Sequence, residues 1–204
     1  GYGAGHNVAI KKALAISKYH LIINPDILFQ KRTIEKIYEF MEGNSNVGMI
    51  IPKILYPNGS IQYLYRLLPT PFDFLLKRLN ISILSNRRFL KYELKFVDHN
   101  KIIYAPYLSG CFMFIRNEVF KKVGIFDERF FMYFEDVDLS RRIHKYYQTI
   151  YYPEAIAYHE YEGGSCKNLI LMKYFISSAI KYYNKWGWFL DRERKFFNKE
   201  TLKR

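Results

Sequence analysis

The chain has 204 residues, of which half are apolar and 19% aromatic, and its formal net charge is +13. This composition excludes a disordered segment and suits one globular domain with a substantial core. The excess of Lys and Arg favours anionic partners such as nucleic acid, acidic lipid head groups or phosphorylated small molecules. The two cysteines, Cys111 and Cys166, are too few and too far apart for a disulfide framework or a zinc knuckle, so a reducing compartment is expected.

The first part of the chain alternates between predicted helix and predicted strand. Apolar periodicity predicts a helix over 8–18, and the short apolar run 21–23 is typical of a central strand buried on both faces. A second helix is predicted over 33–42, followed by another buried strand over 47–51. Such an alternation favours an α/β layer architecture with a parallel sheet.

The second part of the chain is expected to continue this pattern around a less regular stretch, 69–100. A strand over 107–115 is interrupted by Ser109 and Gly110, where the sequence reads SG. The remaining predicted elements are helices over 117–123, 137–147 and 168–186 and a strand over 149–158. None of the apolar runs approaches the ~20 residues that a membrane-spanning helix needs.

Asn24, Pro25 and Asp26 directly follow the first predicted strand. Ligands of open α/β sheets bind beyond the carboxyl ends of strands. A carboxylate there can hold Mg²⁺ or Mn²⁺, which in turn holds a diphosphate. All three residue types also form turns, so a strand-ending turn is the alternative interpretation.

Glu135 and Asp136 stand at the start of a predicted helix, directly after the aromatic run 130–134. Acids stabilise helix N-termini, so a structural role is one interpretation. A carboxylate beside aromatic rings is also partly desolvated, which raises its proton affinity and suits a general base. Asp138 is spaced for an ion pair with Arg142 and is expected to be structural.

His159 follows the last predicted strand and precedes the pair Gly163 and Gly164, in the stretch YHEYEGGS. A neutral imidazole is a common metal ligand. A single histidine is also frequent as a polar loop residue, so the residues alone leave both interpretations open.

In their order and spacing these features resemble family 2 glycosyltransferases of the rhamnosyltransferase-like type, which act in bacterial cell-surface polysaccharide synthesis. The stretches that carry the resemblance are GYGAGHNVAI, LIINPDI, SGCFMFIRNEVFKKVGIFDERFFMYFEDVDLSRRI and YHEYEGGS. The third is the most specific, because it combines SG-x-FM-x-IR with VG-x-FDE-x-FF-x-Y-x-EDVDL-x-R. The resemblance covers nearly the whole chain and is weakest over 67–98.

The resemblance implies a GT-A fold, an α/β architecture with a mixed, mostly parallel sheet flanked by helices. It implies an inverting transfer from a nucleotide-diphosphate sugar to a saccharide or lipid-linked saccharide acceptor in the cytoplasm. The implied cofactor is Mn²⁺ or Mg²⁺. Asp26 and His159 would hold this ion, and Asn24 occupies the first position of the family's DxD-type motif.

By the same resemblance Asp136 is the catalytic base, which takes a proton from the acceptor hydroxyl, and Glu135 helps to position the acceptor. Ser109, Gly110 and Phe134 are assigned to substrate binding. The aromatic side chains before Glu135 would pack the acceptor side and exclude water.

Members of this family usually begin with a strand, helix and strand that hold the nucleotide, and we expect such a unit upstream of Gly1. Residues 1–165 are therefore expected to form a partial catalytic domain. Gly3 and Gly5, together with Gly1, resemble a phosphate loop near the donor pocket, with Asn7 as a further contact. Their spacing is not G-x-G-x-x-G.

Residues 166–204 are expected to form a basic, amphipathic helical extension. Its Lys and Arg residues are mixed with aromatic residues that include Trp186, Trp188, Phe189, Phe196 and Phe197. Such a segment can lie in a membrane interface, which would suit a lipid-linked acceptor at the inner face of the cell membrane. A packed terminal helix with a solvated face is the alternative.

Two other classes of function remain open from the residues. The charge and the aromatic content permit a nucleic-acid-binding module. The chain has no helix-turn-helix, RNP or zinc signature, and acids gather at the candidate site, so no nucleic-acid partner is expected. A non-catalytic remnant of a glycosyltransferase is the other alternative, and the intact acids and histidine argue against it.

Overall fold

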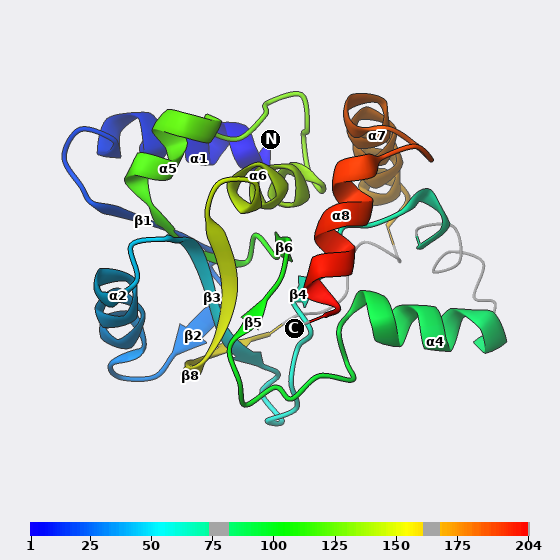
Figure 1. The fold of residues 1–204 in the computed structure, drawn as a ribbon. Coiled ribbons are helices and arrows are strands. Elements are labelled where there is room, and N and C mark those ends of the chain that lie inside the picture. The colour runs from blue at the N-terminus through cyan, green and yellow to red at the C-terminus, as the bar shows by residue number, and fades with distance from the viewer. Residues whose placement is uncertain (74–81, 161–167, 204) are drawn as a thin grey trace.

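The computed structural model describes residues 1–73, 82–160 and 168–203. Gly163, Gly164 and Cys166 lie outside the described residues, as does the expected boundary at 165. Helices surround a central sheet in Figure 1. The helices are α1 (Tyr2–Ala13), α2 (Thr33–Gly43), α4 (Ser82–Tyr92), α5 (Asn117–Val123), α6 (Glu135–His144), α7 (Leu169–Trp186) and α8 (Arg192–Thr201). The strands are β1 (Tyr19–Ile23), β2 (Ile27–Phe29), β3 (Val47–Leu55), β4 (Tyr65–Arg66), β5 (Ile103–Tyr104), β6 (Tyr107–Leu108), β7 (Phe112–Arg116) and β8 (Gln148–His159).

The sheet has the strand order β1-β7-β3-β8-β2, and β5 also pairs with β8. The expected mixed α/β architecture with flanking helices is confirmed. Its parallel pair among the described strands is β3 with β8, and the other ladders of this sheet are antiparallel. The prediction of β1 as a central strand is wrong for the described sheet, where β1 lies at the edge and only Ile22 is fully buried. A short apolar run does not encode which strand will pair with it.

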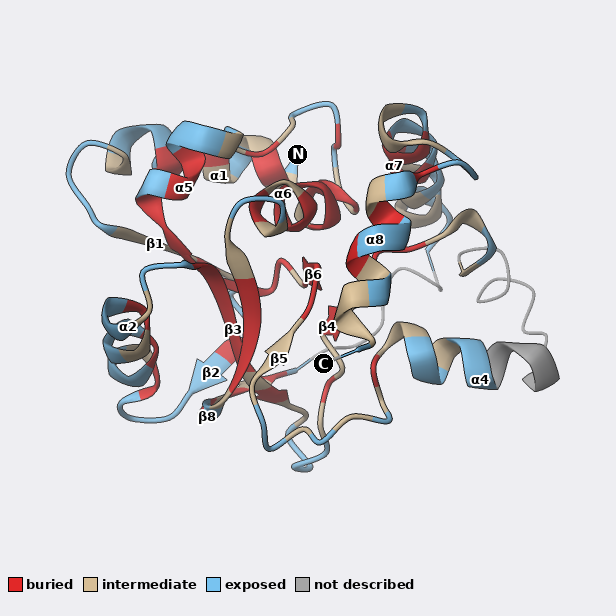
Figure 2. Cartoon of the chain, viewed as in Figure 1, coloured by how far each residue is buried: buried red, intermediate tan, exposed pale blue. Residues whose placement is uncertain are grey.

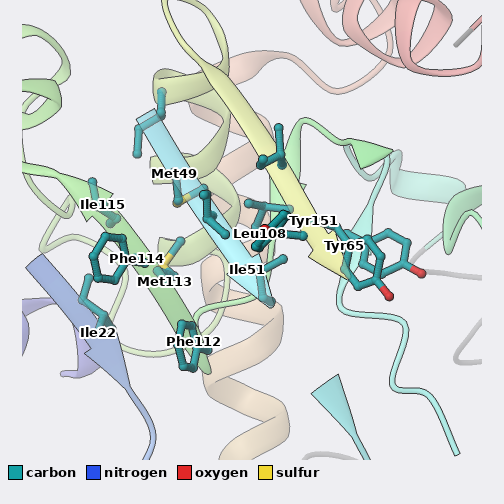
Figure 3. Close-up of a cluster of buried hydrophobic side chains, with 14 of the residues drawn as sticks. Ile22, Met49, Ile51, Tyr65, Leu108, Phe112, Met113, Phe114, Ile115 and Tyr151 are labelled. Atoms are coloured by element: carbon teal, nitrogen blue, oxygen red, sulfur yellow. The ribbon is translucent and has the colours of Figure 1, made fainter. Parts of the chain in front are cut away.

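The core is continuous across the strands. All of β7 and most of β3 are buried, as expected for strands covered on both faces. Figure 3 shows Ile22 of β1, Met49 and Ile51 of β3 and the β7 side chains in one layer. The rings of Tyr65 and Tyr151 meet at the other end of this layer, with centroids 4.1 Å apart. This packing makes the sheet a rigid support for the loops at its ends.

Helices α1, α5 and α6 lie on one side of the sheet and α2 lies on the other (Figure 1). Helices α1, α2 and α5 each turn a buried face toward the strands and an exposed face outward, whereas α6 is buried or half-buried along its whole length (Figure 2). The predicted helices over 33–42, 117–123 and 168–186 are confirmed, and α6 begins two residues earlier than predicted, at Glu135. The predicted helix over 8–18 is shifted, because α1 begins at Tyr2 and ends at Ala13.

The C-terminal helices α7 and α8 pack beside α6 through a second apolar cluster. Its buried members are Leu68, Tyr107, Phe130, Phe134, Val137, Ala179, Tyr182, Tyr183 and Phe197. Arg141 of α6 forms a buried ion pair with Asp191, at 2.6 Å, and its guanidinium lies 4.1 Å from the ring centre of Trp186. The described helices include none that is both long and apolar enough to cross a bilayer.

Candidate active site

Segments that are far apart in the sequence meet where β1 and β8 end and β7 begins. Register places Ile23, the last residue of β1, opposite Phe112, the first of β7. The SG segment lies between β6 and β7, so it reaches the same place. On the other side of β8, Ile27 of β2 is opposite His159. The predicted acids and histidine are therefore presented at one edge of the sheet.

Asp26 and His159 form the first part of the site. Because Ile27 pairs with His159, Asp26 stands next to the histidine, and the Glu160 N–H donates to the Asp26 backbone oxygen at 3.3 Å. The Asp26 Oδ2 lies 3.2 Å from the His159 Nε2. The histidine side chain is 4% exposed and the aspartate 43% exposed, so the pair opens to solvent through the carboxylate.

This pair fits a divalent metal ion. Ligand atoms on neighbouring corners of an octahedron with metal–ligand bonds of about 2.1 Å are about 3 Å apart, close to the observed spacing. The described residues contain no group of three or more His, Cys, Asp or Glu side chains that could hold a metal. Mg²⁺ is commonly bound by one or two carboxylates together with substrate phosphates and water, so two protein ligands are compatible with such an ion.

Asn24 is not placed with this pair. Its Oδ1 lies 3.2 Å from the Tyr2 hydroxyl, and its backbone N–H donates to the Cys111 carbonyl at 2.9 Å. The DxD-type position that the sequence gives to Asn24 is thus occupied by a side chain that contacts helix α1.

Asp136 forms the second part of the site, in the first turn of α6. Its Oδ2 accepts hydrogen bonds from the Gly110 N–H at 3.0 Å and from the Tyr107 hydroxyl at 3.2 Å. Its Oδ1 accepts from the Val137 N–H at 2.8 Å. These donors fix the position of the carboxylate and favour its ionised form.

The absence of a side chain at Gly110 allows this approach. A Cβ built there would lie 3.1 Å from the Asp136 Cβ and 3.6 Å from its Oδ2. The neighbouring Ser109 donates its N–H to the carbonyl of Leu64, directly before β4, at 2.8 Å. The SG pair therefore acts through its backbone, as a turn that meets the start of α6.

Tyr2 connects the two parts of the site. Its hydroxyl donates to the Gly110 carbonyl at 2.6 Å and lies beside Asn24. Burial and the charges of Asp136, Glu135 and Asp26 raise the pKa of this tyrosine, so its hydroxyl stays protonated. The network runs from Asp136 through Gly110 and Tyr2 to Asn24, two residues before Asp26.

Glu135 and Asp136 are acids in different surroundings. Burial and the neighbouring Asp136 charge raise the pKa of Glu135 to about 8. Its Oε2 is buried and has no hydrogen-bond partner among the described residues. Burial also raises the pKa of Asp136, but its N–H and O–H donors oppose this rise. Burial therefore favours the protonated form of Glu135, and Asp136 is the carboxylate whose ionised form the surrounding donors stabilise.

The backbone directly before these acids is strained. Tyr133 and Phe134 adopt left-handed conformations, with φ of 68° and 65°. Each such residue costs about 1–3 kcal/mol, and this kind of strain gathers at functional sites. The left-handed backbone at Tyr133 and Phe134 leads directly into the first turn of α6, where Asp136 contacts the SG turn.

Comparisons with known proteins identify the fold and its relatives. No family model matches the chain. Among solved structures, that of GalNAc-T7 with UDP, GalNAc and Mn²⁺ matches with a TM-score of 0.63 at 13% identity, over 100% of this chain and 38% of that one. This protein has a GT-A fold.

The sequence relatives are glycosyltransferases. The chain is 30% identical over 144 residues to the low-salt glycan biosynthesis hexosyltransferase Agl10 of Haloferax volcanii, covering 70% of this chain and 42% of that protein. It is 25% identical over 178 residues to the N-acetylglucosaminyl-diphospho-decaprenol L-rhamnosyltransferase of Mycobacterium tuberculosis, covering 78% and 56%. It is also 25% identical over 210 residues to rhamnosyltransferase WbbL of Escherichia coli K12, covering 97% and 74%. The resemblance to rhamnosyltransferase-like glycosyltransferases is confirmed, and the chain spans about half the length of the first two relatives.

In this GT-A chain the glycines near the start are not a loop. Gly3 and Gly5 lie inside helix α1, so the predicted phosphate loop is wrong. A Cβ at Gly3 would lie 2.9 Å from the Phe126 Cβ, which indicates close helix packing. Asn7 is buried, and its amide exchanges two hydrogen bonds with the Phe126 backbone.

The expected aromatic wall is largely part of the core. Phe134 is buried, and its ring lies 5.3–5.4 Å from those of Phe175 and Tyr182. Phe130 is also buried, whereas Phe131 is 46% exposed. Asp138 pairs with Arg142 at 2.8 Å, so its predicted structural role is confirmed.

Sequence reasoning missed several residues of this site. The predicted acids and histidine are surrounded by Tyr2, Gln62, Arg66 and Tyr107. No role in the site was predicted from the sequence for any of these four residues. Arg66 is half-buried, and its positive charge lowers the pKa of Asp136. The contacts of Tyr2, Tyr107 and Gln62 with this site join residues that are 22 or more positions apart, so they exist only in the folded chain.

Proposed function

We propose that the protein is the acceptor and metal side of an inverting glycosyltransferase. It would move a sugar from a nucleotide-diphosphate donor to a saccharide or lipid-linked saccharide acceptor, in cell-surface polysaccharide synthesis. The observation that carries the proposal is the pairing of Asp26 with His159 at the same sheet edge as Asp136. Hydrogen bonds through Gly110 and Tyr2 connect Asp136 to Asn24, two residues before Asp26.

In this mechanism Asp136 accepts the proton of the acceptor hydroxyl through its half-buried carboxylate. Hydrogen bonds from Gly110, Tyr107 and Val137 hold the carboxylate still, so little reorganisation accompanies the step. Glu135 keeps its proton and donates it as a hydrogen bond toward the acceptor. The new glycosidic bond forms on the face of the sugar opposite the departing diphosphate.

Asp26 and His159 would bind Mn²⁺ or Mg²⁺, which when bound neutralises charge on the leaving diphosphate. The similarity to an N-acetylglucosaminyl-diphospho-decaprenol L-rhamnosyltransferase supports a lipid-linked acceptor. The fold shared with GalNAc-T7, whose solved structure holds UDP and Mn²⁺, supports a metal-bound nucleotide donor.

The test is turnover of a nucleotide-sugar panel with Mn²⁺, with and without EDTA. It compares this chain with a version that carries its natural upstream residues. We expect the longer version, at least, to release nucleoside diphosphate, and we expect EDTA to abolish this release. Release that survives EDTA would contradict the metal role, and no release from either folded protein, with saccharide and lipid-linked acceptors supplied, would favour the non-catalytic remnant.

We further propose that the 166–204 extension meets the inner face of the cell membrane, so that the protein acts in the cytoplasm at that surface. At the turn between α7 and α8, Phe189 is 61% exposed and Leu190 89% exposed, and Phe72 lies beside Phe189 with ring centroids 6.0 Å apart. Exposed apolar side chains within a basic segment suit an anionic interface.

Vesicle pelleting tests this contact. Binding to anionic vesicles is expected to fall with salt and to be lost when Phe189 and Leu190 are both changed to Ser. Ile16→Ser, at an exposed apolar residue away from this turn, is the control and should bind normally. Equal pelleting of the double variant would contradict the proposal, and salt-dependent binding to generic DNA or RNA would contradict the expectation of no nucleic-acid partner.

A further inference from the structure

Behind the Asp26–His159 pair lies the side chain of Gln62, which is 3% exposed. It contacts His159 twice. The Gln62 Nε2 donates to the His159 backbone oxygen at 2.8 Å, and the Gln62 Oε1 lies 3.0 Å from the His159 Nδ1. A buried amide that meets both the main chain and the ring of one residue fixes how that residue is turned.

The first of these contacts decides the direction of the second. A backbone carbonyl only accepts hydrogen bonds, so the amide nitrogen of Gln62 must face it. The amide oxygen must then face the His159 Nδ1, and an oxygen of this kind accepts only. The Nδ1 is therefore the ring nitrogen that carries a hydrogen.

The tautomer has a consequence on the other side of the ring. With its hydrogen on Nδ1, a neutral imidazole presents a lone pair at Nε2. That lone pair faces the Asp26 Oδ2 at 3.2 Å, and a carboxylate oxygen also offers electrons. Two electron-pair donors at this distance repel each other unless a cation lies between them or the ring takes a second proton.

The backbone holds Gln62 where this arrangement requires it. The chain folds back after β3 in a turn through Gly59, which adopts a φ of 82°. Leu55 bridges to Ile61, and the Gln62 N–H donates to the Ile54 carbonyl at 2.8 Å. The amide thus approaches His159 from the end of β3, which is paired with β8.

We propose that Gln62 is the positioning residue that holds His159 as an Nε2 ligand for a divalent cation shared with Asp26. This inference rests on the proposed metal-dependent function. Groups that orient a metal-binding histidine typically change metal affinity by 10–100-fold when they are replaced.

The experiment uses Mn²⁺ alone as the probe and has two readouts. Electron paramagnetic resonance measures Mn²⁺ affinity, and ¹⁵N spectra of histidine-labelled protein report which ring nitrogen carries hydrogen, with His159→Gln assigning the signal. Gln62→Leu removes both contacts. Gln62→Glu is the conservative variant, because a protonated carboxyl can donate to the backbone oxygen and accept from Nδ1.

Thr33→Val is the matched control. Thr33 is also buried, and its hydroxyl donates to the Ile156 carbonyl of the same strand at 2.8 Å, away from the histidine ring. Its replacement removes a comparable hydrogen bond to β8 without touching the ring.

We expect the unchanged protein to hold His159 with hydrogen on Nδ1. Gln62→Leu should mix the tautomers and weaken Mn²⁺ binding by roughly 10–100-fold. Gln62→Glu should retain the tautomer, and Thr33→Val should leave both readouts unchanged.

Three results would overturn the inference. Hydrogen on Nε2 but not on Nδ1 in the unchanged metal-free protein would show that Gln62 does not set the ring. Unaltered Mn²⁺ affinity in Gln62→Leu would show that Gln62 does not contribute to cation binding. No Mn²⁺ binding by the unchanged protein would remove the metal ligand role and the metal-dependent function together. The spectra decide the role of Gln62 in ring orientation even if the leucine variant fails to fold.

Discussion

The backbone N–H of Gly110 donates a hydrogen bond to the Asp136 Oδ2 at 3.0 Å, across 26 positions of sequence. On its other side, the carbonyl of the same glycine accepts from Tyr2 at 2.6 Å. One peptide segment therefore positions the proposed base and ties it to Tyr2 of helix α1, whose hydroxyl also contacts Asn24. This relationship makes the geometry of the site sensitive to the SG turn.

Replacing Asp136 by Asn should reduce transfer by roughly 10²–10⁴-fold, because an amide cannot accept the acceptor's proton. The fold should survive at a cost of about 1–3 kcal/mol, because an amide group must now face N–H and O–H donors. Product formation and urea unfolding measure the two effects. Tyr107→Phe removes one donor but keeps the base, so its activity should fall by less than about tenfold. Retained turnover in Asp136→Asn would contradict the assignment of Asp136 as the base.

Replacing Gly110 by Ala should push Asp136 away from its donors, because the new Cβ would lie 3.1 Å from the Asp136 Cβ. A displacement of this kind is expected to lower activity by roughly 100-fold and stability by about 1–3 kcal/mol. Gly5→Ala is the matched control, since a Cβ there meets nothing within 4 Å and lies in helix α1. It should raise stability by about 0.5–1 kcal/mol. Normal activity in Gly110→Ala would show that close approach to the turn is dispensable.

Stability should fall as pH rises through the range set by Glu135. Its pKa is about 8 in the folded protein against 4.5 ordinarily, so between these values the folded state keeps a proton that the unfolded state releases. The stabilisation is complete below about pH 4.5 and lost as pH passes about 8. Urea unfolding from pH 5 to 9 measures this slope.

Glu135→Gln provides the comparison for that slope. The neutral amide does not titrate, so the variant should lose less stability than the unchanged protein between pH 5 and pH 9. Asp136 keeps some slope in the variant, because burial raises its pKa as well. Identical pH profiles for the two proteins would contradict a buried, protonated Glu135.

Asp191→Asn should detach the C-terminal helices from α6. The side chains of Asp191 and Arg141 are 2% and 1% exposed, and loss of the Asp191 charge leaves the buried Arg141 with only the partly exposed Glu193, at 2.9 Å, as its anionic partner among the described residues. Breaking a buried pair costs up to about 3–5 kcal/mol, while Asn still serves as an N-cap for α8. Glu39→Gln, which breaks an exposed pair with Arg32, should change the urea midpoint little. A similar midpoint for both variants would show that the buried pair does not hold α8.

Most helices and strands of this chain can be predicted from patterns of neighbouring residues. The apolar runs of β3 and β8 and the periodicity of α2 and α7 are patterns that neighbouring residues set. The ends of α7 are also set by local residue types. Asn168 caps its start, and Gly187, with a φ of 99°, caps its end. The motif with Asp136 and the positions of Asp26 and His159 could likewise be read from the chain, because residue type and spacing carry them.

Which of these elements meet depends on contacts that form only in the folded chain. The pairing of β1 with β7, the helical start of α1 and the burial of Phe134 depend on partners distant in sequence. Gln62 and His159 are 97 positions apart, and Tyr2 and Gly110 are 108 apart. Local patterns set conformational preference, but a hydrogen bond or a packed ring at such separation exists only after the chain has folded.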